Sequence, residues 1–248
     1  MLKKFFYSLL FLLSFTVYTN AQVLYAEYDV SYGIFGKIGT AKATLKKEHK
    51  KYVIDIKLQA TGLAKLLSSG REEHHISKGH IVDGVMISDL YQVIKSHGKV
   101  VVNKEYWIDH KKKRVKKKYK KYKQGKLVTD KTSYLNFYAK DDLLTLYFNL
   151  DTVINDKHKA KTYYFEAVGA ERQKGKVTVI IPKSKALQAY YNALGKDSDW
   201  YATAIIHQKI FSSKEGHLIL GVAKDGITNK AVLKDVIFFG DIRAVRTK

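Results

Sequence analysis

Strict alternation of apolar and polar side chains is the feature of this chain that most constrains its fold. Apolar residues occupy every second position from Leu24 to Ile34, and Glu27, Asp29 and Ser31 lie between them. Successive side chains of a strand point to opposite faces of a sheet, so this period of two predicts a half-buried strand. The same alternation returns at residues 41–45 and 52–60, with KKEHKK as a turn. Three consecutive strands with short links indicate an antiparallel meander.

Similar patterns continue to the end of the chain. SSKEG and KDGITN have the composition of turns between the later strands. Further strands are expected at residues 73–77, 81–88, 91–96, 100–109, 162–168, 176–182, 200–211, 217–223 and 231–245. Short helices are expected at residues 62–70, 140–151 and 184–195, the second with Asp141 and Asp142 in its first turn and the third between a Ser184 N-cap and a Gly195 stop.

Strands at both ends with helices between them predict a mostly β protein. We expect a single antiparallel sheet, strongly curved or closed into a barrel, with two or three short helices, because closure removes exposed strand edges. With 46% hydrophobic and 12% aromatic residues, the chain is too apolar to be disordered. No internal repeat or Pro-rich linker divides it, so residues 22–248 are expected to form a single β-rich domain.

The first residues, MLKKFFYSLLFLLSFTVYTNA, have the pattern of a secretory signal peptide. Lys3 and Lys4 precede an apolar stretch from Phe5 to Val17, and Thr19 and Ala21 occupy the positions that signal peptidase reads. We therefore expect residues 1–21 to be cleaved and the protein to be periplasmic. The alternative is an uncleaved anchor, although the stretch is shorter than the roughly 20 apolar residues of a bilayer span. A lipoprotein is excluded because the chain has no cysteine to acylate.

Excess positive charge is the main clue to partners. Two of the 45 Lys and Arg lie in the predicted signal peptide, which leaves 43 against 23 Asp and Glu and a net charge of +20. The densest run is DHKKKRVKKKYKKYKQGK, residues 109–126. As a strand it would carry charge on both faces and project as a hairpin with KQGK at its tip, or lie on a sheet edge. As a helix it would place like charges at i, i+4, which favours the hairpin.

This run is the candidate binding site for an anionic partner. The expected partner is a cell-envelope lipid, glycan or acidic protein, and peripheral membrane contact is compatible with the charge. The alternative is a solvated face without a ligand. Nucleic acid is not expected, because an exported protein rarely meets it. The candidate residues are Lys111, Lys112, Lys113, Arg114, Lys116, Lys117, Lys118, Lys120, Lys121 and Lys123.

No catalytic motif, metal site or cofactor site is evident. REEHH, residues 71–75, would place only two of its possible ligands on each strand face, whereas zinc needs three or four. The leading hypothesis is a non-catalytic envelope protein that binds an anionic or amphiphilic component through the basic hairpin and a barrel cavity. The alternative is an envelope hydrolase with a site assembled from scattered groups such as Glu72, His74 and His207. A barrel packed solid by its own side chains is the alternative to a cavity.

Several segments also resemble a known family. YDVSYGIFGKIGTAKATL, YVIDIKLQATGLAKLLSSGREEHHI, DDLLTLYFNL and GDIRAVR, which together span most of residues 25–245, resemble exported bacterial proteins of "domain of unknown function 3108". The motifs include Arg71 after a small-residue turn. The resemblance implies an envelope location and a β-rich, barrel-like fold, and it implies no catalytic residues.

Overall fold

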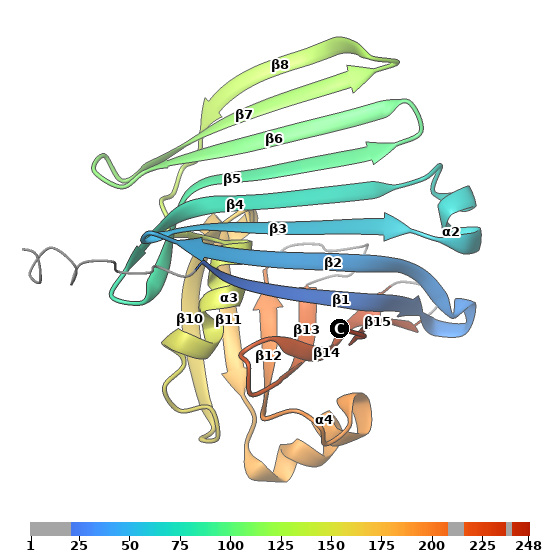
Figure 1. The fold of residues 1–248 in the computed structure, drawn as a ribbon, viewed down its shortest axis with the longest axis vertical. Coiled ribbons are helices and arrows are strands. Elements are labelled where there is room, and N and C mark those ends of the chain that lie inside the picture. The colour runs from blue at the N-terminus through green and yellow to red at the C-terminus, as the bar shows by residue number, and fades with distance from the viewer. Residues whose placement is uncertain (1–20, 208–215, 237–239) are drawn as a thin grey trace, which may run out of the picture.

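The computed structural model describes residues 21–207, 216–236 and 240–248 (Figure 1). Of the predicted signal peptide, residues 1–20 lie outside the described residues. So do residues 208–211 at the end of one predicted strand, most of the SSKEG turn, and residues 237–239.

Fifteen strands of the described residues form one sheet. In chain order they are β1 (Gln22–Tyr32), β2 (Lys37–Glu48), β3 (Lys51–Ala60), β4 (Glu72–Val82), β5 (Val85–His97), β6 (Val100–Asp109), β7 (Arg114–Lys123), β8 (Lys126–Tyr134), β9 (Asp141–Asp142), β10 (Lys161–Val168), β11 (Lys176–Ile181), β12 (Trp200–Ile206), β13 (Gly216–Val222), β14 (Thr228–Val236) and β15 (Gly240–Arg246). The helices are α2 (Gly62–Leu67), α3 (Leu143–Val153) and α4 (Leu187–Leu194), with 3-10 turns η1 (Gly33–Phe35), η2 (Arg172–Gly175) and η3 (Ser184–Ala186).

The sheet has the strand order β8-β7-β6-β5-β4-β3-β2-β1-β15-β14-β13-β12-β11-β10-β9. Neighbouring strands are antiparallel except β9 and β10, which are parallel. The pairing of β1 with β15 joins the two ends of the chain into one continuous surface. The predicted fold class, a mostly β protein with one strongly curved antiparallel sheet and a few short helices, is confirmed.

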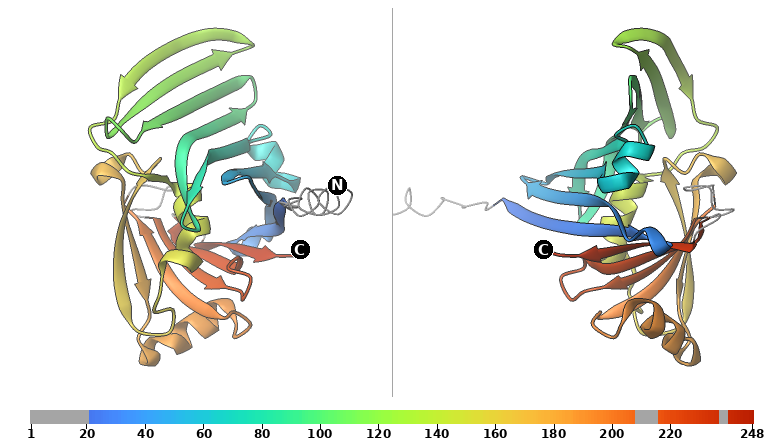
Figure 2. Two further views of the ribbon diagram at one scale, coloured as in Figure 1. Left: turned by 60° about the vertical axis from the view of Figure 1, so that its left-hand side comes forward. Right: turned by 90° about the vertical axis from the view of Figure 1, so that its right-hand side faces the viewer.

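Strong curvature rolls this sheet around α3 without closing it into a barrel (Figure 2). The edge strand β9 turns inward against β5, where the Ser88 N–H donates to the Lys140 carbonyl at 3.1 Å. Strands β6, β7 and β8 lie beyond this contact in the strand order and extend the sheet as a curved wing with β8 at its edge (Figure 1). The sheet therefore has a concave inner face and a convex outer face.

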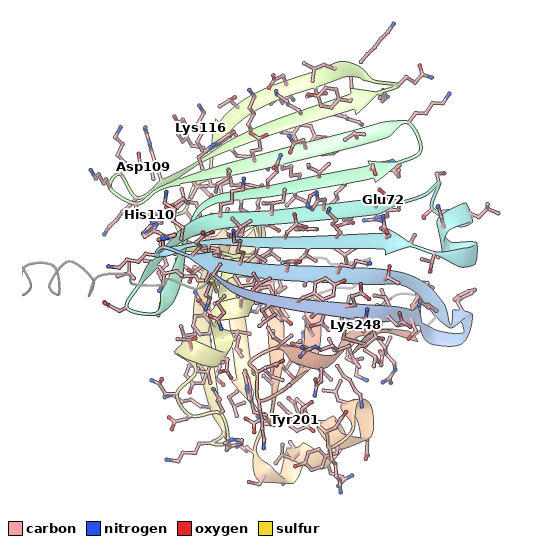
Figure 3. All side chains as sticks on the ribbon, viewed as in Figure 1. Glu72, Asp109, His110, Lys116, Tyr201 and Lys248 are labelled. Atoms are coloured by element: carbon pink, nitrogen blue, oxygen red, sulfur yellow. The ribbon has the colours of Figure 1, made fainter. Side chains whose placement is uncertain are left out.

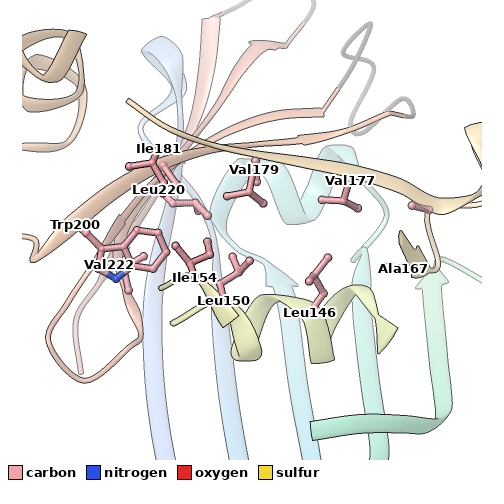
Figure 4. Close-up of a cluster of buried hydrophobic side chains, with 13 residues drawn as sticks. Leu146, Leu150, Ile154, Ala167, Val177, Val179, Ile181, Trp200, Leu220 and Val222 are labelled. Carbon is pink, nitrogen blue, oxygen red and sulfur yellow. The ribbon is translucent and has the colours of Figure 1, made fainter. Parts of the chain in front are cut away.

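Helix α3 fills part of the concave side because one of its faces is apolar. Leu146, Leu150 and Ile154 pack against Trp200 and the inner side chains of β11 and β13 (Figure 4). The Trp200 indole N–H donates to Asp151 Oδ1 at 3.0 Å, so the largest ring of this core also has its polar atom satisfied. This core anchors the helix to the half of the sheet formed by β10–β15.

Asp142 attaches the start of α3 to the opposite wall. Its Oδ1 accepts from the backbone N–H groups of Leu144 and Thr145, so Asp142 is the N-cap of α3 and lies one position before the first turn in which the sequence placed it. Its Oδ2 accepts from Ser77 of β4 at 2.5 Å and from Ser88 of β5 at 2.6 Å. One buried carboxylate thus joins the helix to two strands.

Three boundaries predicted from the sequence are wrong. The strand expected at residues 81–88 is interrupted by a turn that ends β4 and begins β5, because Asp83 and Gly84 have φ values of 49° and 79° and reverse the chain. The strand expected at residues 231–245 is two paired strands, β14 and β15. Ser184 does not cap a helix: it begins η3, and α4 follows without a side-chain cap. The Gly195 stop is confirmed, since its N–H donates to the Tyr191 carbonyl.

Candidate ligand-binding cavity

An apolar cavity of about 480 Å³ lies inside the curved sheet. Strands β1–β3 form one wall and β13–β15 the other, and Tyr147 of α3 lies at its inner end. A volume of roughly 300–1,000 Å³ is typical of small-molecule sites in proteins. The apolar side chains that line it include Val30, Ile38, Ile56, Leu58, Leu218 and Ile242. The interior is therefore not packed solid, which the sequence had left open.

The alternation in the strands explains why this cavity is apolar. Tyr28 of β1, Ala41 of β2 and Leu58 of β3 are cross-strand partners, and all three face inward. Small residues are frequent in the lining: Gly39, Ala41 and Ala43 come from β2, Ala231 from β14 and Ala244 from β15. Because these side chains are short, they leave space inside the curved sheet that α3 does not fill.

The mouth of the cavity is at the end of the sheet that carries α2. Ser68 and Arg71, which follow α2, line the cavity and reach solvent, whereas Ala43 and Leu220 at the other end are buried. Figure 1 places α2 at the end where β1, β3 and β5 finish. The antiparallel order also brings the β5–β6 and β7–β8 turns to this end.

Glu73 is the charged residue at the boundary of the cavity. Its side chain is 9% exposed and contacts three basic groups: Arg71 at 2.6 Å, Lys95 at 2.7 Å and His75 at 3.2 Å. Burial alone would raise the pKa of the Glu73 carboxyl, but the hydrogen bonds from His75, Lys95 and Arg71 outweigh it and hold that pKa well below its usual range. Glu73 is therefore ionised and holds the three side chains together.

A polar chain continues from Glu73 into the interior. His75 Nδ1 is 2.9 Å from the Tyr91 hydroxyl, and the Tyr91 ring stacks on Tyr106 with centroids 5.8 Å apart. Tyr106 donates to Glu171, which also accepts from Lys117 at 2.5 Å. These side chains come from β4, β5, β6 and β7 and lie on the same concave face as the cavity.

The predicted basic hairpin exists, as β7 and β8 with a turn at Gln124 and Gly125. The hairpin does not project away from the sheet, because β7 pairs with β6 along its whole length; it lies at the sheet edge, as the alternative predicted, with β8 outermost. Val115 is fully buried, and Lys117 is only 17% exposed and bound to Glu171. The strand is accommodated because the inner lysine Lys117 binds an acid and the inner lysine Lys123 is exposed at the end of the strand.

The ten predicted site residues do not form one surface. Lys111, Lys112 and Lys113 make the exposed β6–β7 turn, next to Asp109 and His110, at the far end of the sheet from Glu72 and the cavity mouth (Figure 3). The alternation of β7 then divides the rest. Arg114, Lys116, Lys118 and Lys120 lie on the convex face, and Lys117, Lys121 and Lys123 lie on the concave face.

The groups considered for a hydrolase do not gather at one site, because His207 lies apart from Glu72 and His74. Glu72 hydrogen-bonds Gln59 and His74 pairs with Asp55, both on the convex face of β3 and β4. His207 follows β12, in the other half of the sheet, and contacts Thr178 at 3.0 Å. Across residues 21–207, 216–236 and 240–248, no three His, Asp or Glu side chains gather in a way that could hold a metal ion. No helix in that part of the chain has the length and apolar content to cross a bilayer.

Sequence reasoning missed Glu73, Lys95 and Lys104 as parts of one surface. The alternation of side chains along β4 could have indicated this surface. Glu73 lies on the same face of the strand as His75 and Ser77, and the buried residues of that strand show which face points inward. The pairing of Glu73 with Lys95 depends on the β4–β5 register, which contains an irregularity between Lys78 and Gly79 and follows from no local pattern.

Comparison with known proteins gives a fold and no family. No family model matches this chain, and no curated protein matches it in sequence. A crystal structure of a β-barrel-like protein of domain of unknown function DUF1849 from Brucella abortus is similar, with a TM-score of 0.52 and 11% identity over 93% of this chain and 98% of that chain. The assignment to domain of unknown function 3108 is wrong, because no model supports it and the structural neighbour belongs to a different family. At this identity the likeness establishes a barrel-like fold alone.

Proposed function

We propose that this chain is an exported, non-catalytic envelope protein that binds an amphiphile, with the alkyl chain of the ligand in the apolar cavity. The cavity of about 480 Å³ carries the proposal, because its size and apolar lining suit a hydrocarbon chain better than a polar metabolite. Its mouth has charged groups at Arg71 and Glu73, so an amphiphile can bury its apolar part and keep its polar part at the rim.

The length of the alkyl chain should determine the affinity of the protein for the amphiphile. Each methylene transferred from water into the cavity contributes about 0.8 kcal/mol, which is roughly fourfold in Kd. We expect the Kd of a series of straight-chain carboxylates to fall by about this factor for each added carbon until the cavity is full, and then to level off. Isothermal titration calorimetry or displacement of a fluorescent fatty acid measures the series.

A matched pair of variants tests where the tail binds. Ala41→Phe places a ring in the empty space beside Tyr28 and Leu58 and should abolish binding of the longer chains. Val53→Phe adds a ring at an exposed position on the convex face of β3 and should leave binding unchanged. Absence of binding by the wild-type protein, or equal loss in both variants, would refute the proposal.

We further propose that the cavity-mouth end docks on an anionic lipid surface. Lys65, Lys99, Lys123 and Lys126 are exposed at this end, and within the described residues none of them has an ion pair. Exposed apolar side chains accompany them: Leu66 of α2 is 79% exposed, Leu127 of β8 50% and Phe35 of η1 45%. Lysines around exposed apolar groups suit the interface of an anionic membrane. Within the predicted run, this assigns docking to its C-terminal end rather than to Lys111–Lys113.

A further inference from the structure

The concave face of β4–β7 carries a cluster of cations next to the cavity. Its members are Arg71, Lys95, Lys104, Lys117 and Lys121. Cross-strand register places Glu73 opposite Lys95, Lys95 opposite Val102, and Val102 opposite Lys121. Lys104 is two residues from Val102 on the same face, since Tyr106 and Ile108 of that parity are buried inside. Neighbours of this kind on adjacent strands lie within about 5–8 Å of each other, so one small anion can reach several of the ammonium groups.

Lys104 is the unusual member of the cluster. It is partly buried, and within the described residues it has no hydrogen bond or ion pair, whereas Lys95 binds Glu73 and Lys117 binds Glu171. A partly buried cation without a partner is unfavourable. Burial lowers the pKa of the Lys104 ammonium, and Lys117 and Lys95 lower it further despite the opposing effect of Glu171. An anion placed here would relieve both the burial cost and the repulsion.

The charges around Lys104 are not balanced. Arg71, Lys95, Lys104, Lys117 and Lys121 are basic, and Glu73 and Glu171 are the acids that contact members of this group. The remaining charge of about three favours a ligand with more than one negative charge, and lysines bind phosphate groups as point charges. Glu73 lines the cavity and also pairs with Lys95, so this cluster and the apolar cavity are continuous.

We propose that this cluster binds the phosphate-bearing headgroup of the amphiphile whose tail occupies the cavity, with Lys104 as its central cation. The proposal rests on the proposed function and deepens it, because it names the class of ligand. The headgroup would lie over β5–β7 and give the Lys104 ammonium an anionic partner. The alkyl tail would pass Glu73 and enter the cavity between β1–β3 and β13–β15.

Calorimetric titration with two ligands that share a tail tests this headgroup. Dodecyl phosphate and dodecyl maltoside, each below its micellar concentration, differ in charge at the head. We expect the wild-type protein to bind the phosphate at least about tenfold more tightly, as expected for one charge-assisted contact. Lys104→Gln should remove most of this preference and leave the maltoside unchanged, and Lys104→Arg should retain it.

Lys120→Gln is the matched control, because Lys120 lies on the convex face one residue from Lys121. It should change neither affinity. Thermal unfolding of all variants should be close to wild type, since Lys104 has no partner to lose within the described residues. A loss of phosphate preference in the Lys120 variant equal to that in Lys104→Gln would show general charge attraction and would overturn the assignment to Lys104.

The remaining outcomes separate this inference from the proposed function. If both ligands bind wild type equally and Lys104→Gln has no effect, the headgroup site is wrong and amphiphile binding stands. If neither ligand binds, amphiphile binding is wrong and the headgroup site fails with it. Inorganic phosphate distinguishes a free anion from a headgroup: we expect it to bind far more weakly than dodecyl phosphate. Equally tight, Lys104-dependent binding of inorganic phosphate would overturn the connection to the cavity.

Discussion

At the scale of single residues, two buried carboxyls show how surroundings decide the behaviour of one functional group. Glu73 has three basic partners and a depressed pKa. Asp141 is 5% exposed, and its Oδ1 has no hydrogen-bond partner among the described residues. Burial raises the pKa of Asp141 to about 6, and the neighbouring Asp142 adds to the effect although Lys140 opposes it. The two groups should therefore affect stability with opposite sign.

Glu73 should stabilise the fold above its unfolded pKa. Because its folded pKa lies below the usual value of 4.5, the folded state binds fewer protons than the unfolded state as the pH falls below about 4.5, and stability is lost there. We expect Glu73→Gln to lower the free energy of unfolding by roughly 1–3 kcal/mol at pH 7 and by less at pH 3. Urea unfolding at a series of pH values measures this. Glu72→Gln, at an exposed neighbouring position, is the control.

Asp141 should destabilise the fold when it is ionised. Its folded pKa of about 6 exceeds its ordinary value of 3.8, so the folded state gains stability as the pH falls from 6 toward 4. We expect Asp141→Asn to raise the free energy of unfolding by about 1–2 kcal/mol at pH 7.5, and the gain to shrink below pH 6. A gain that is independent of pH would contradict a cost due to charge.

At the scale of elements, α3 organises the interior because it touches both halves of the sheet. Its apolar face packs on β11–β13, and Asp142 connects its first turn to β4 and β5. Tyr52 of β3 joins this connection through Thr145 at 2.7 Å. The position of Tyr147 at the inner end of the cavity therefore depends on a hydrogen-bonded cap as well as on packing.

Removal of that cap should loosen the helix. Asp142→Ala deletes an N-cap and leaves the buried hydroxyls of Ser77 and Ser88 without their acceptor, so we expect a loss of roughly 2–4 kcal/mol in the free energy of unfolding. Because Tyr147 would then be less well held, the affinity for long-chain amphiphiles should fall as well. Asp130→Ala, at an exposed site on β8, should change neither quantity. A wild-type unfolding curve for Asp142→Ala would show that packing alone holds α3.

At the scale of the whole molecule, the antiparallel order gives the two ends of the sheet different characters. One end has α2, η1, the β7–β8 turn and the cavity mouth, and the other has the exposed lysines of the β6–β7 turn. A protein that exchanges amphiphiles with a membrane needs its opening, its exposed apolar side chains and its cations at the same end. The first of these two ends meets that requirement.

Vesicle co-sedimentation tests this orientation. We expect the protein to bind vesicles that contain anionic lipid, and binding to weaken as salt rises from 50 to 300 mM because the lysine contacts are screened. A variant with Lys99, Lys123 and Lys126 changed to Gln should lose most of this binding. A variant with Lys111, Lys112 and Lys113 changed to Gln has the same charge and should retain it. The reverse result would place docking at the opposite end, and equal binding to neutral vesicles would argue against an electrostatic contact.

Most strands, the β7–β8 turn and the acidic start of α3 follow from local sequence patterns, whereas the turn at Asp83 and Gly84 and the division of residues 231–245 into two strands do not. A period of two is a local property, so the inward faces of β1, β2 and β3 follow from residues 24–60. The same holds for the β7–β8 hairpin, whose strands and turn are contiguous in the chain, and for the acidic residues at the start of α3. Each of these depends on interactions between residues close together in the chain.

The cavity and the cations beside it depend on contacts between strands that are distant in the chain. Whether a curved sheet closes, spirals or packs solid depends on which distant strands meet, as when β1 pairs with β15 and β9 turns inward against β5. The contacts of Glu73 with Lys95 and of Lys117 with Glu171 join residues 22 and 54 positions apart. Short side chains from β2, β14 and β15 leave a cavity because they line the same space inside the sheet, and that arrangement arises from register and curvature, which alternation along one strand does not encode.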